Sequence, residues 1–315
     1  MKSEKFTFTL FAAIIMVIFS YSIDLFASEK IASTSQKKIP EEQLWDIYYD
    51  FLSKIKPYGI PLDRQKHEKE IGPTLTHIKK THIRTMTESY ALIYKPRRIN
   101  VEIDEYTGEI RNYMLTPVNY YENSDKNEKF TTKMKKEEAI EKAESYLYLN
   151  TVIKTEEFLI NVGPSGDEWH IDFHRKQGNY EFMKDRIIIV FSEKYGLLYY
   201  QNNFFSDECD INLKIDETKA NELTEKYFSD INGKSLLKKI FVKYSRIVIV
   251  NPALLKLDYE TNKLPMDEMR KSRLVWETGY SGSSNKNQPI AVAFYIDAIN
   301  GELIHYIIEP LLISK

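Results

Sequence analysis

The sequence predicts an α+β protein made of tandem units, each with one helix followed by a small antiparallel sheet. The main observation is a hairpin pattern that occurs three times: an apolar strand, an Asp or Ser, three further turn residues, a Gly and a second strand. It lies at residues 104–108 and 297–301 and, with Ser192 in place of Asp, at residues 192–196. Gly adopts the positive φ of a tight loop at low cost, and an Asp or Ser side chain holds such a loop through backbone N–H groups. Three copies in one chain indicate a repeated module.

An amphipathic helix is predicted before each set of strands, at residues 41–55, 132–147 and 216–227. The apolar residues of each segment recur at spacings of three and four, which places them on one helix face. Thr132 and Asp216 are the expected N-caps of the second and third helices. The positions expected to face a core are Leu44, Ile47, Tyr48, Phe51 and Ile55; Ala139, Ile140, Ala143 and Leu147; and Ala220, Leu223 and Tyr227.

Strands are expected after each helix, and together these elements predict units at residues 41–118, 130–205 and 214–315. A helix over one face of a small antiparallel sheet buries the apolar side of both. The charged residues 63–70 are predicted to form a mobile connection inside the first unit. The expected strands are those near Ile83 and at residues 90–94, 157–162, 168–174, 185–191, 246–250, 273–279 and 290–297.

The composition is that of a globular protein of two or three domains, since 315 residues with 43% hydrophobic and 29% charged residues are enough for a core. Lys and Arg number 44 against 46 for Asp and Glu, so the net charge of -2 gives no sign of a nucleic-acid-binding surface. Cys209 is the single cysteine, which excludes an internal disulfide and a thiolate metal cluster. Trp169 and Trp276 stand in matching predicted strands and are expected to be core residues.

Residues 1–27 have the layout of a secretory signal peptide or an N-terminal anchor. Lys2 and Lys5 precede an apolar, charge-free run at residues 6–23, and a small residue closes the segment. We predict an exported protein, either secreted or located in the cell envelope or periplasm. A cleaved signal peptide is the first interpretation, and the alternative is an anchor formed by residues 6–23 that stays in the membrane. The polar residues 28–40 are expected to be a linker.

The third unit contains residues 247–252 (IVIVNP), 273–278 (RLVWET) and 294–304 (FYIDAINGELI), which follow an amphipathic helix. This arrangement resembles the PepSY domain, and it is similar to the carboxyl half of the propeptides of thermolysin-type metallopeptidases. The second unit shares the helix and Trp169 but departs from the pattern at Ser192. The first unit resembles the pattern mainly over its hairpin.

PepSY domains are exported, non-catalytic modules. In propeptides they pack against the peptidase, restrain it and assist its folding, and in stand-alone proteins they are thought to bind or regulate envelope partners. The resemblance therefore implies tandem PepSY-like modules that bind a peptidase or another envelope protein. The His-Glu-x-x-His motif of a catalytic metallopeptidase domain does not occur in the chain.

His170, Asp172 and His174 are the best candidates for a metal site, because alternation along one predicted strand places all three on one face. Neighbours on that face are about 7 Å apart, so a metal ion would need a ligand from another strand. The competing interpretation, which we prefer, is a solvent-facing polar stripe. The alternative function is an exported metal-dependent hydrolase that uses these three residues. Our preferred assignment has no catalytic, cofactor-binding or metal-binding residue and no cofactor.

Other candidates for chemistry are weaker. Residues 279–283 lack the second Gly of a nucleophile elbow and are expected to lie in a hairpin loop. The acidic neighbours of Cys209 disfavour a thiolate, so an inert thiol is expected. His67 lacks the second His of a zincin motif, and His77 and His82 lie in an irregular basic stretch.

We therefore predict a non-enzymatic, exported module that binds a protein partner and no nucleic acid. The partner is expected to dock on an open face or edge of a sheet, away from the covering helix. The third unit is the expected docking surface, because it keeps the full pattern and its predicted loop at residues 281–288 is polar. A fragment of residues 216–315 is expected to retain partner binding.

Overall fold

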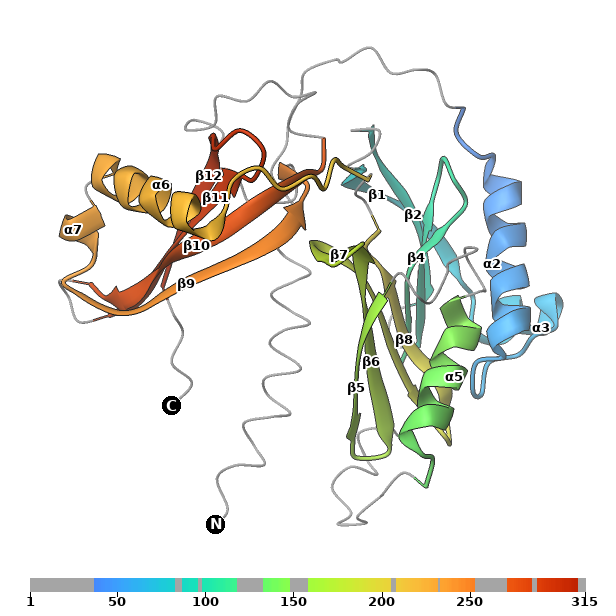
Figure 1. Ribbon diagram of the computed structural model, residues 1–315. Coiled ribbons are helices and arrows are strands. Elements are labelled where there is room, and N and C mark those ends of the chain that lie inside the picture. The colour runs from blue at the N-terminus through green and yellow to red at the C-terminus, as the bar shows by residue number, and fades with distance from the viewer. Residues whose placement is uncertain are drawn as a thin grey trace.

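The protein has the α+β architecture that the sequence predicts (Figure 1). The structure is a computed structural model and describes residues 37–82, 87–95, 98–117, 133–147, 158–204, 208–231, 233–252, 271–284 and 288–310. Residues 1–27, predicted to be a signal peptide or anchor, and residues 28–36 of the predicted linker lie outside these ranges. None of the helices in the described ranges has the length and apolar content needed to span a bilayer.

Within the described residues, three sets of elements follow one another, and in each set a long helix precedes four antiparallel strands. The first set contains α2 (Glu41–Ile55), α3 (Arg64–Glu70), β1 (Thr74–His82), β2 (Thr87–Lys95), β3 (Ile99–Asp104) and β4 (Ile110–Leu115). The second contains α5 (Lys136–Leu147), β5 (Phe158–Ser165), β6 (Glu168–Gln177), β7 (Tyr180–Ser192) and β8 (Gly196–Asn202). The third contains α6 (Glu217–Asp230), α7 (Gly233–Leu236), β9 (Lys239–Val250), β10 (Arg273–Ser283), β11 (Pro289–Asp297) and β12 (Leu303–Pro310). Trp169 in β6 and Trp276 in β10 are buried, as predicted.

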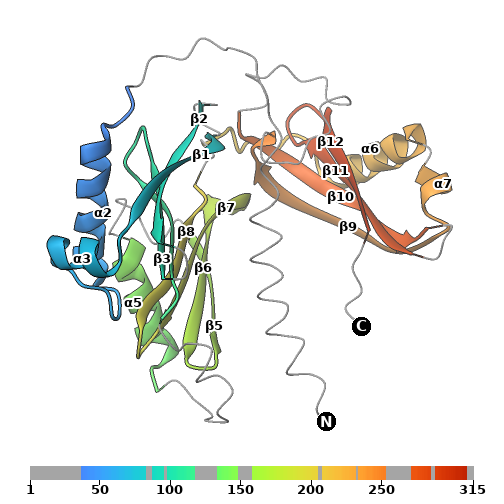
Figure 2. The ribbon, with the colours of Figure 1, turned by 180° about the vertical axis from the view of Figure 1, so that it is seen from behind.

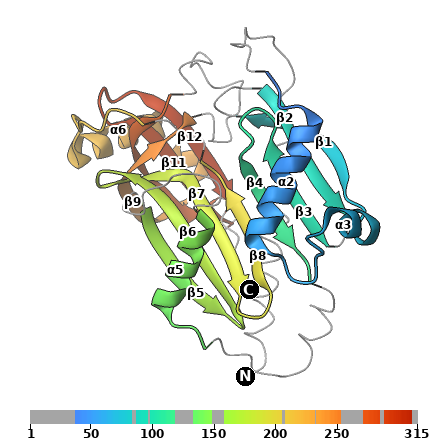
Figure 3. The same cartoon turned by 90° about the vertical axis from the view of Figure 1, so that its right-hand side faces the viewer.

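The first two sets share one continuous sheet in the order β1-β2-β3-β4-β8-β7-β6-β5. Strands β4 and β8 join the two sets, with Tyr113 opposite Tyr200. Helices α2 and α5 lie on the same face of this sheet (Figure 3), and their apolar sides enter one core with both tyrosines. In the described residues, the strands of the third set, β9-β10-β11-β12, form a second sheet that joins the first through β7 into one 12-stranded assembly, and α6 lies over one face of this second sheet. In the described residues, the pairing between the two sheets is that of Ile249 in β9 with Phe182 in β7. The division of the chain into three domains stays a prediction.

The turns form as predicted, because the side chain that opens each turn accepts hydrogen bonds from backbone N–H groups. Asp104 accepts them from the second and third residues that follow, at 2.9 and 3.1 Å. Asp297 accepts them from the equivalent positions at 2.8 and 3.1 Å. The Ser192 hydroxyl accepts one from the N–H of Tyr195 at 2.9 Å.

The glycines of the first and third turns also pack against the helix of their own set. The φ angle is 75° at Gly108 and 79° at Gly301, a region that other residues rarely adopt. A Cβ at Gly108 would lie 3.1 Å from Cδ1 of Ile47 in α2, and one at Gly301 would lie 3.1 Å from Cδ1 of Leu223 in α6. Gly196 has a similar φ of 70°, but within the described residues no heavy atom lies within 4 Å of such a Cβ.

A tie between the turn and the residues before the helix holds each helix over its sheet. Ile39, two residues before α2, donates its N–H to the Glu105 carbonyl oxygen at 2.7 Å. Ile215, two residues before α6, donates its N–H to the Ala298 carbonyl oxygen at 2.9 Å. In the second set the carboxylate of Glu193 accepts two backbone N–H groups from the segment before α5, at 2.8 and 2.9 Å. The three turns therefore have the same structural role.

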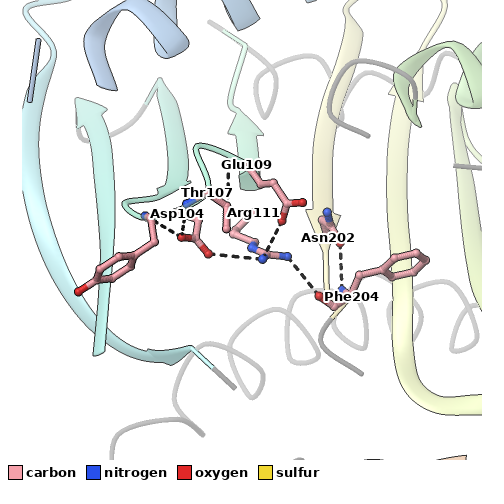
Figure 4. A network of polar contacts seen from close by, with 7 residues as sticks. Asp104, Thr107, Glu109, Arg111, Asn202 and Phe204 are labelled. Atoms are coloured by element: carbon pink, nitrogen blue, oxygen red, sulfur yellow. Dashed lines mark hydrogen bonds and ion pairs between the residues drawn. The ribbon is translucent and has the colours of Figure 1, made fainter. Parts of the chain in front are cut away.

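A buried arginine stands behind the first turn (Figure 4). The side chain of Arg111 is 4% exposed, and its Nη2 lies 3.4 Å from Asp104 Oδ2 and 2.7 Å from Glu109 Oε2. Its Nη1 donates to the Phe204 carbonyl oxygen at 3.3 Å, which ties this turn to the chain that leaves β8. Two carboxylates therefore compensate the buried charge of this guanidinium.

The end of β6 and the start of β7 connect the two sheets. The guanidinium of Arg175 lies 4.4 Å from the ring centre of Phe182 and 5.5 Å from that of Phe204. Phe182 belongs to the apolar core of the third set, although β7 belongs to the second. The side-chain amide of Gln177 donates to the Cys209 carbonyl oxygen at 2.9 Å and accepts from the Cys209 N–H at 3.1 Å.

Two elements differ from the predictions. Residues 63–70 are not a mobile connection, because Asp63 caps helix α3 by accepting a hydrogen bond from the N–H of Lys66 at 2.9 Å. The second helix begins at Lys136 rather than directly after Thr132, a residue outside the described ranges.

The third helix has its predicted cap but a different buried face. Asp216 accepts a hydrogen bond from the N–H of Lys219 at 2.8 Å. The hydroxyl of Thr224 donates to a carbonyl oxygen of its own helix and contacts the hydroxyl of Thr278, so this polar residue is buried with its hydrogen bonds satisfied. The fully buried residues of α6 are Ala220, Thr224 and Phe228, and the partly buried ones include Leu223 and Tyr227.

We predict that Gly301→Val destabilises the protein more than Gly196→Val. Both substitutions force a β-branched residue into positive φ, but only at Gly301 would the new side chain press on a helix residue, Leu223. The expected losses in the free energy of unfolding are roughly 2–5 kcal/mol at Gly301 and about 1–2 kcal/mol at Gly196, measured by urea unfolding of the full chain. Equal losses in both variants would show that packing of the turn on α6 contributes nothing.

Candidate functional site

The histidine stripe of β6 is placed as predicted, with its side chains opposite a buried apolar face. His174 Nε2 lies 3.0 Å from Asp172 Oδ2, and its Nδ1 lies 2.7 Å from Glu181 Oε1 on β7. His170 is more exposed, and its Nε2 lies 3.2 Å from Glu168 Oε2. Among the described residues, no three His, Cys, Asp or Glu side chains are arranged to hold a metal ion. His174 is therefore held between two carboxylates of the sheet.

In the first set, His67 and His77 contact structural groups. His67 is buried, its Nδ1 lies 2.9 Å from the Pro61 carbonyl oxygen, and its Nε2 lies 2.9 Å from the Tyr48 hydroxyl. Because a carbonyl oxygen only accepts, Nδ1 carries the proton and Nε2 accepts from Tyr48. Burial lowers the pKa of His67, which favours this neutral form. His77 Nδ1 lies 2.5 Å from a buried carboxylate oxygen of the first turn, and His82 ends β1.

Cys209 has the properties of an inert thiol. Burial, followed by the charge of Asp210, raises the pKa of this thiol to about 11, which keeps it protonated. Its backbone groups bond to Gln177, so the residue links the connecting segment to β6.

The prediction of a loop at residues 279–283 is wrong, because these residues belong to β10. A Cβ at Gly279 would lie 2.1 Å from the Val292 carbonyl oxygen, and one at Gly282 would lie 2.0 Å from the Lys239 carbonyl oxygen. The glycines therefore permit a close approach of neighbouring strands. In the sequence alone, glycines with this role look the same as glycines of a loop. The predicted loop at residues 281–288 is correspondingly shorter.

The clearest candidate for a binding surface is the start of β9, the strand at the lower border of the sheet of the third set in Figures 1 and 2. β9 pairs with β10 along its length, whereas its other edge pairs with β7 at Ile249. Between Lys239 and Lys243, no strand of the described part of the chain pairs with this second edge. Ile240, Phe241 and Val242 are exposed in succession.

A polar hollow of about 380 Å³ lies beside this edge, between α6 and the strands β9 and β10. Lys243 crosses it and forms an ion pair of 2.9 Å with Glu225 of α6. The buried hydroxyl of Ser245, which also lines the hollow, has no hydrogen-bond partner among the described residues. The surface was not predicted from the sequence, although the uninterrupted apolar triplet between Lys239 and Lys243 is a signal for it.

No protein-family model matches the sequence, and a search of characterised protein sequences gives no match. Among solved structures, the chain is similar to the Bacillus megaterium YpeB C-terminal domain. The sequence identity is 13%, the match covers 88% of this chain and 99% of that chain, and the TM-score is 0.38. A likeness with so low a TM-score carries no conclusion about function.

We expect His170→Ala to leave both the stability and the metal content of the purified chain unchanged. Its exposed ring contacts Glu168 at the surface, so the change in the free energy of unfolding should stay within about 0.5 kcal/mol. Thermal unfolding and elemental analysis by mass spectrometry measure the two quantities. A zinc or iron content near one per chain that disappears in the variant would favour the hydrolase.

His174 should make stability fall as pH rises. Its pKa is raised, chiefly by the hydrogen bond to Asp172, although burial opposes the shift. A raised folded-state pKa stabilises the fold below the unfolded-state value of about 6.5, and this stabilisation is lost as pH rises through the folded-state pKa. His174→Gln and Asp172→Asn should each flatten this part of the stability profile, measured by urea unfolding from about pH 5 to about pH 9. An unchanged slope in both variants would contradict this assignment.

Proposed function

We propose that this chain is an exported, non-enzymatic module that binds another protein through its third set of elements. The observation that carries the proposal is the start of β9, where Ile240, Phe241 and Val242 are exposed beside a strand edge that no described strand covers. Contiguous exposed apolar surface commonly marks an interaction site. An open strand edge also offers backbone N–H and C=O groups to an extended segment of a partner.

The kind of partner follows from the resemblance of residues 294–304 and their surroundings to PepSY domains and thermolysin-type propeptides. In those propeptides the domain packs against a peptidase and restrains it. By this likeness, the proposed partner is a peptidase or another envelope protein, and the proposed effect is regulation or inhibition.

Export is proposed from the signal-like residues 1–27, with residues 6–23 as a membrane anchor if the segment is retained. A non-enzymatic role is supported by the chemistry of the described polar residues. The thiol of Cys209 is held protonated, and His170 and His174 contact carboxylates of the sheet.

Phe241→Ala is expected to weaken partner capture, because it removes the most exposed side chain of the apolar run, at 58%. The full chain serves as bait in a native cell-envelope extract, and co-purifying proteins are quantified by mass spectrometry. We expect at least about tenfold less partner with Phe241→Ala. Leu159→Ala, which removes a similarly exposed side chain from the border strand β5, is the matched control and should leave capture unchanged.

The proposal also requires that the chain, freed of contaminating peptidases, hydrolyses neither casein nor simple esters. Reproducible hydrolysis would contradict it, as would a partner whose binding maps wholly to residues before 150. The full chain is a better bait than a fragment of residues 216–315, because Phe182 and Ile215 also pack in the core of the third set.

A further inference from the structure

The border strand β9 has more exposed large apolar side chains than the border strands β5 and β12. In the described residues, β5 and β12 each expose one large hydrophobic side chain, at 47% and 40%. β9 exposes Ile240, Phe241 and Val242 at 41%, 58% and 52%. The side chains of a strand alternate between its faces, so three consecutive exposed residues mean that this part of β9 projects beyond the cover of α6.

The charged residues of β9 and of the position before it are all basic: Lys238, Lys239, Lys243 and Arg246. Lys243 and Arg246 are balanced by carboxylates of the same unit at 2.9 and 2.5 Å. Within the described part of the chain, no ion pair is found for Lys238 or Lys239. The ammonium group of Lys239 lies 5.5 Å from the ring centre of Phe241. Positive charge and apolar surface therefore occur together at the open edge.

From this geometry we propose that an extended, acidic segment of a partner protein adds to β9 as a further strand between Lys239 and Lys243. Its carboxylates face Lys238 and Lys239, and one of its apolar side chains packs on Phe241. This inference rests on the proposed function and specifies the chemistry of the partner segment. A second copy of the same edge is a poorer occupant, because it would place basic residues opposite basic residues.

A β-bulge shapes the docking edge. The register between β9 and β10 shifts so that Ile240 pairs with Gly282 and Val242 with Ser281, which leaves Phe241 without a pair in β10. A bulge bends its strand and redirects side chains, which agrees with the high exposure of Phe241. It also limits continuous pairing, so the added strand should be short, about five residues or roughly 16 Å.

An anionic membrane surface also attracts lysines and exposed apolar side chains, but it suits this edge less well. The apolar residues lie along a strand whose second edge has no described strand partner. Backbone N–H and C=O groups that enter hydrocarbon without partners are strongly unfavourable. A peptide strand supplies those partners, and a lipid tail does not.

The test measures binding of fluorescent peptides of about eight residues to the full chain by anisotropy. One peptide alternates Val and Glu, and its control alternates Val and Lys. We expect the acidic peptide to bind at least about tenfold more tightly than the basic one, with an affinity that falls as salt is added. Phe241→Ala should weaken acidic-peptide binding about tenfold, and Lys239→Glu should reduce the preference for the acidic peptide by about the same factor.

Matched variants separate the edge from general effects. Leu159→Ala controls for loss of an exposed apolar side chain, and Lys142→Glu controls for charge reversal. Lys142 suits this purpose because its ammonium group lies 5.3 Å from the ring centre of Tyr146, as that of Lys239 lies 5.5 Å from the ring centre of Phe241. Neither control should change peptide binding. Two N-methylated acidic peptides test for strand addition. One is methylated at the odd-numbered residues and the other at the even-numbered residues, and at least one of the two should lose binding.

Several results would overturn the inference. They are equal binding of acidic and basic peptides, full binding of both N-methylated peptides, and dimerisation that Phe241→Ala abolishes. Binding to phosphatidylglycerol vesicles but to neither peptide would assign the edge to a membrane. If no peptide binds but partner capture still depends on Phe241, the strand-addition inference is wrong and the protein-binding function stands. If capture does not depend on Phe241 either, both are wrong.

Discussion

Asp297 and the residue that follows it join three parts of the third set that are distant in sequence. The Asp297 carboxylate accepts two backbone N–H groups of its own turn, and its Oδ2 lies 3.1 Å from Nη1 of Arg273 at the start of β10. The residue after Asp297 accepts the N–H of Ile215 just before α6. The ion pair therefore joins the turn to the start of β10, and the backbone bond of the next residue joins the same turn to the start of α6. In the first set Asp104 also contacts an arginine, Arg111, which lies in the strand after the turn rather than in the strand before it.

The turn of the second set lacks this charge, because it opens with Ser192, and the set shares its sheet and its core with the first set. Its strand β8 pairs with β4, and its helix shares a core with α2 through buried residues such as Tyr113 and Tyr200. The carboxylate of Glu193 replaces the backbone tie that the other two sets use. One continuous sheet thus combines a turn with a buried ion pair and a turn without one.

The open edge of β9 is a consequence of how the third set joins the rest. Phe182 near one end of β7 pairs with Ile249 near the opposite end of β9 and packs in the third core, so the two sheets meet at that end of β9. The start of β9 lies beyond this contact, next to α7 and the polar hollow. The joint that positions the third set therefore also leaves the apolar triplet accessible to a partner.

Local signals in the chain were sufficient for the α+β class, the three long helices, the three turns and the alternation of the His170 stripe. Helix periodicity, the cap at Asp216 and glycines at positive φ depend on nearby residues, so they can be inferred without a fold. Other features depend on contacts between distant residues. In residues 279–283, Gly279 admits the close approach of β11, and the start of β9 keeps an open edge because β7 pairs with β9 at its other end. No local pattern specifies which strands lie side by side, since strand pairing is a contact between segments far apart in sequence.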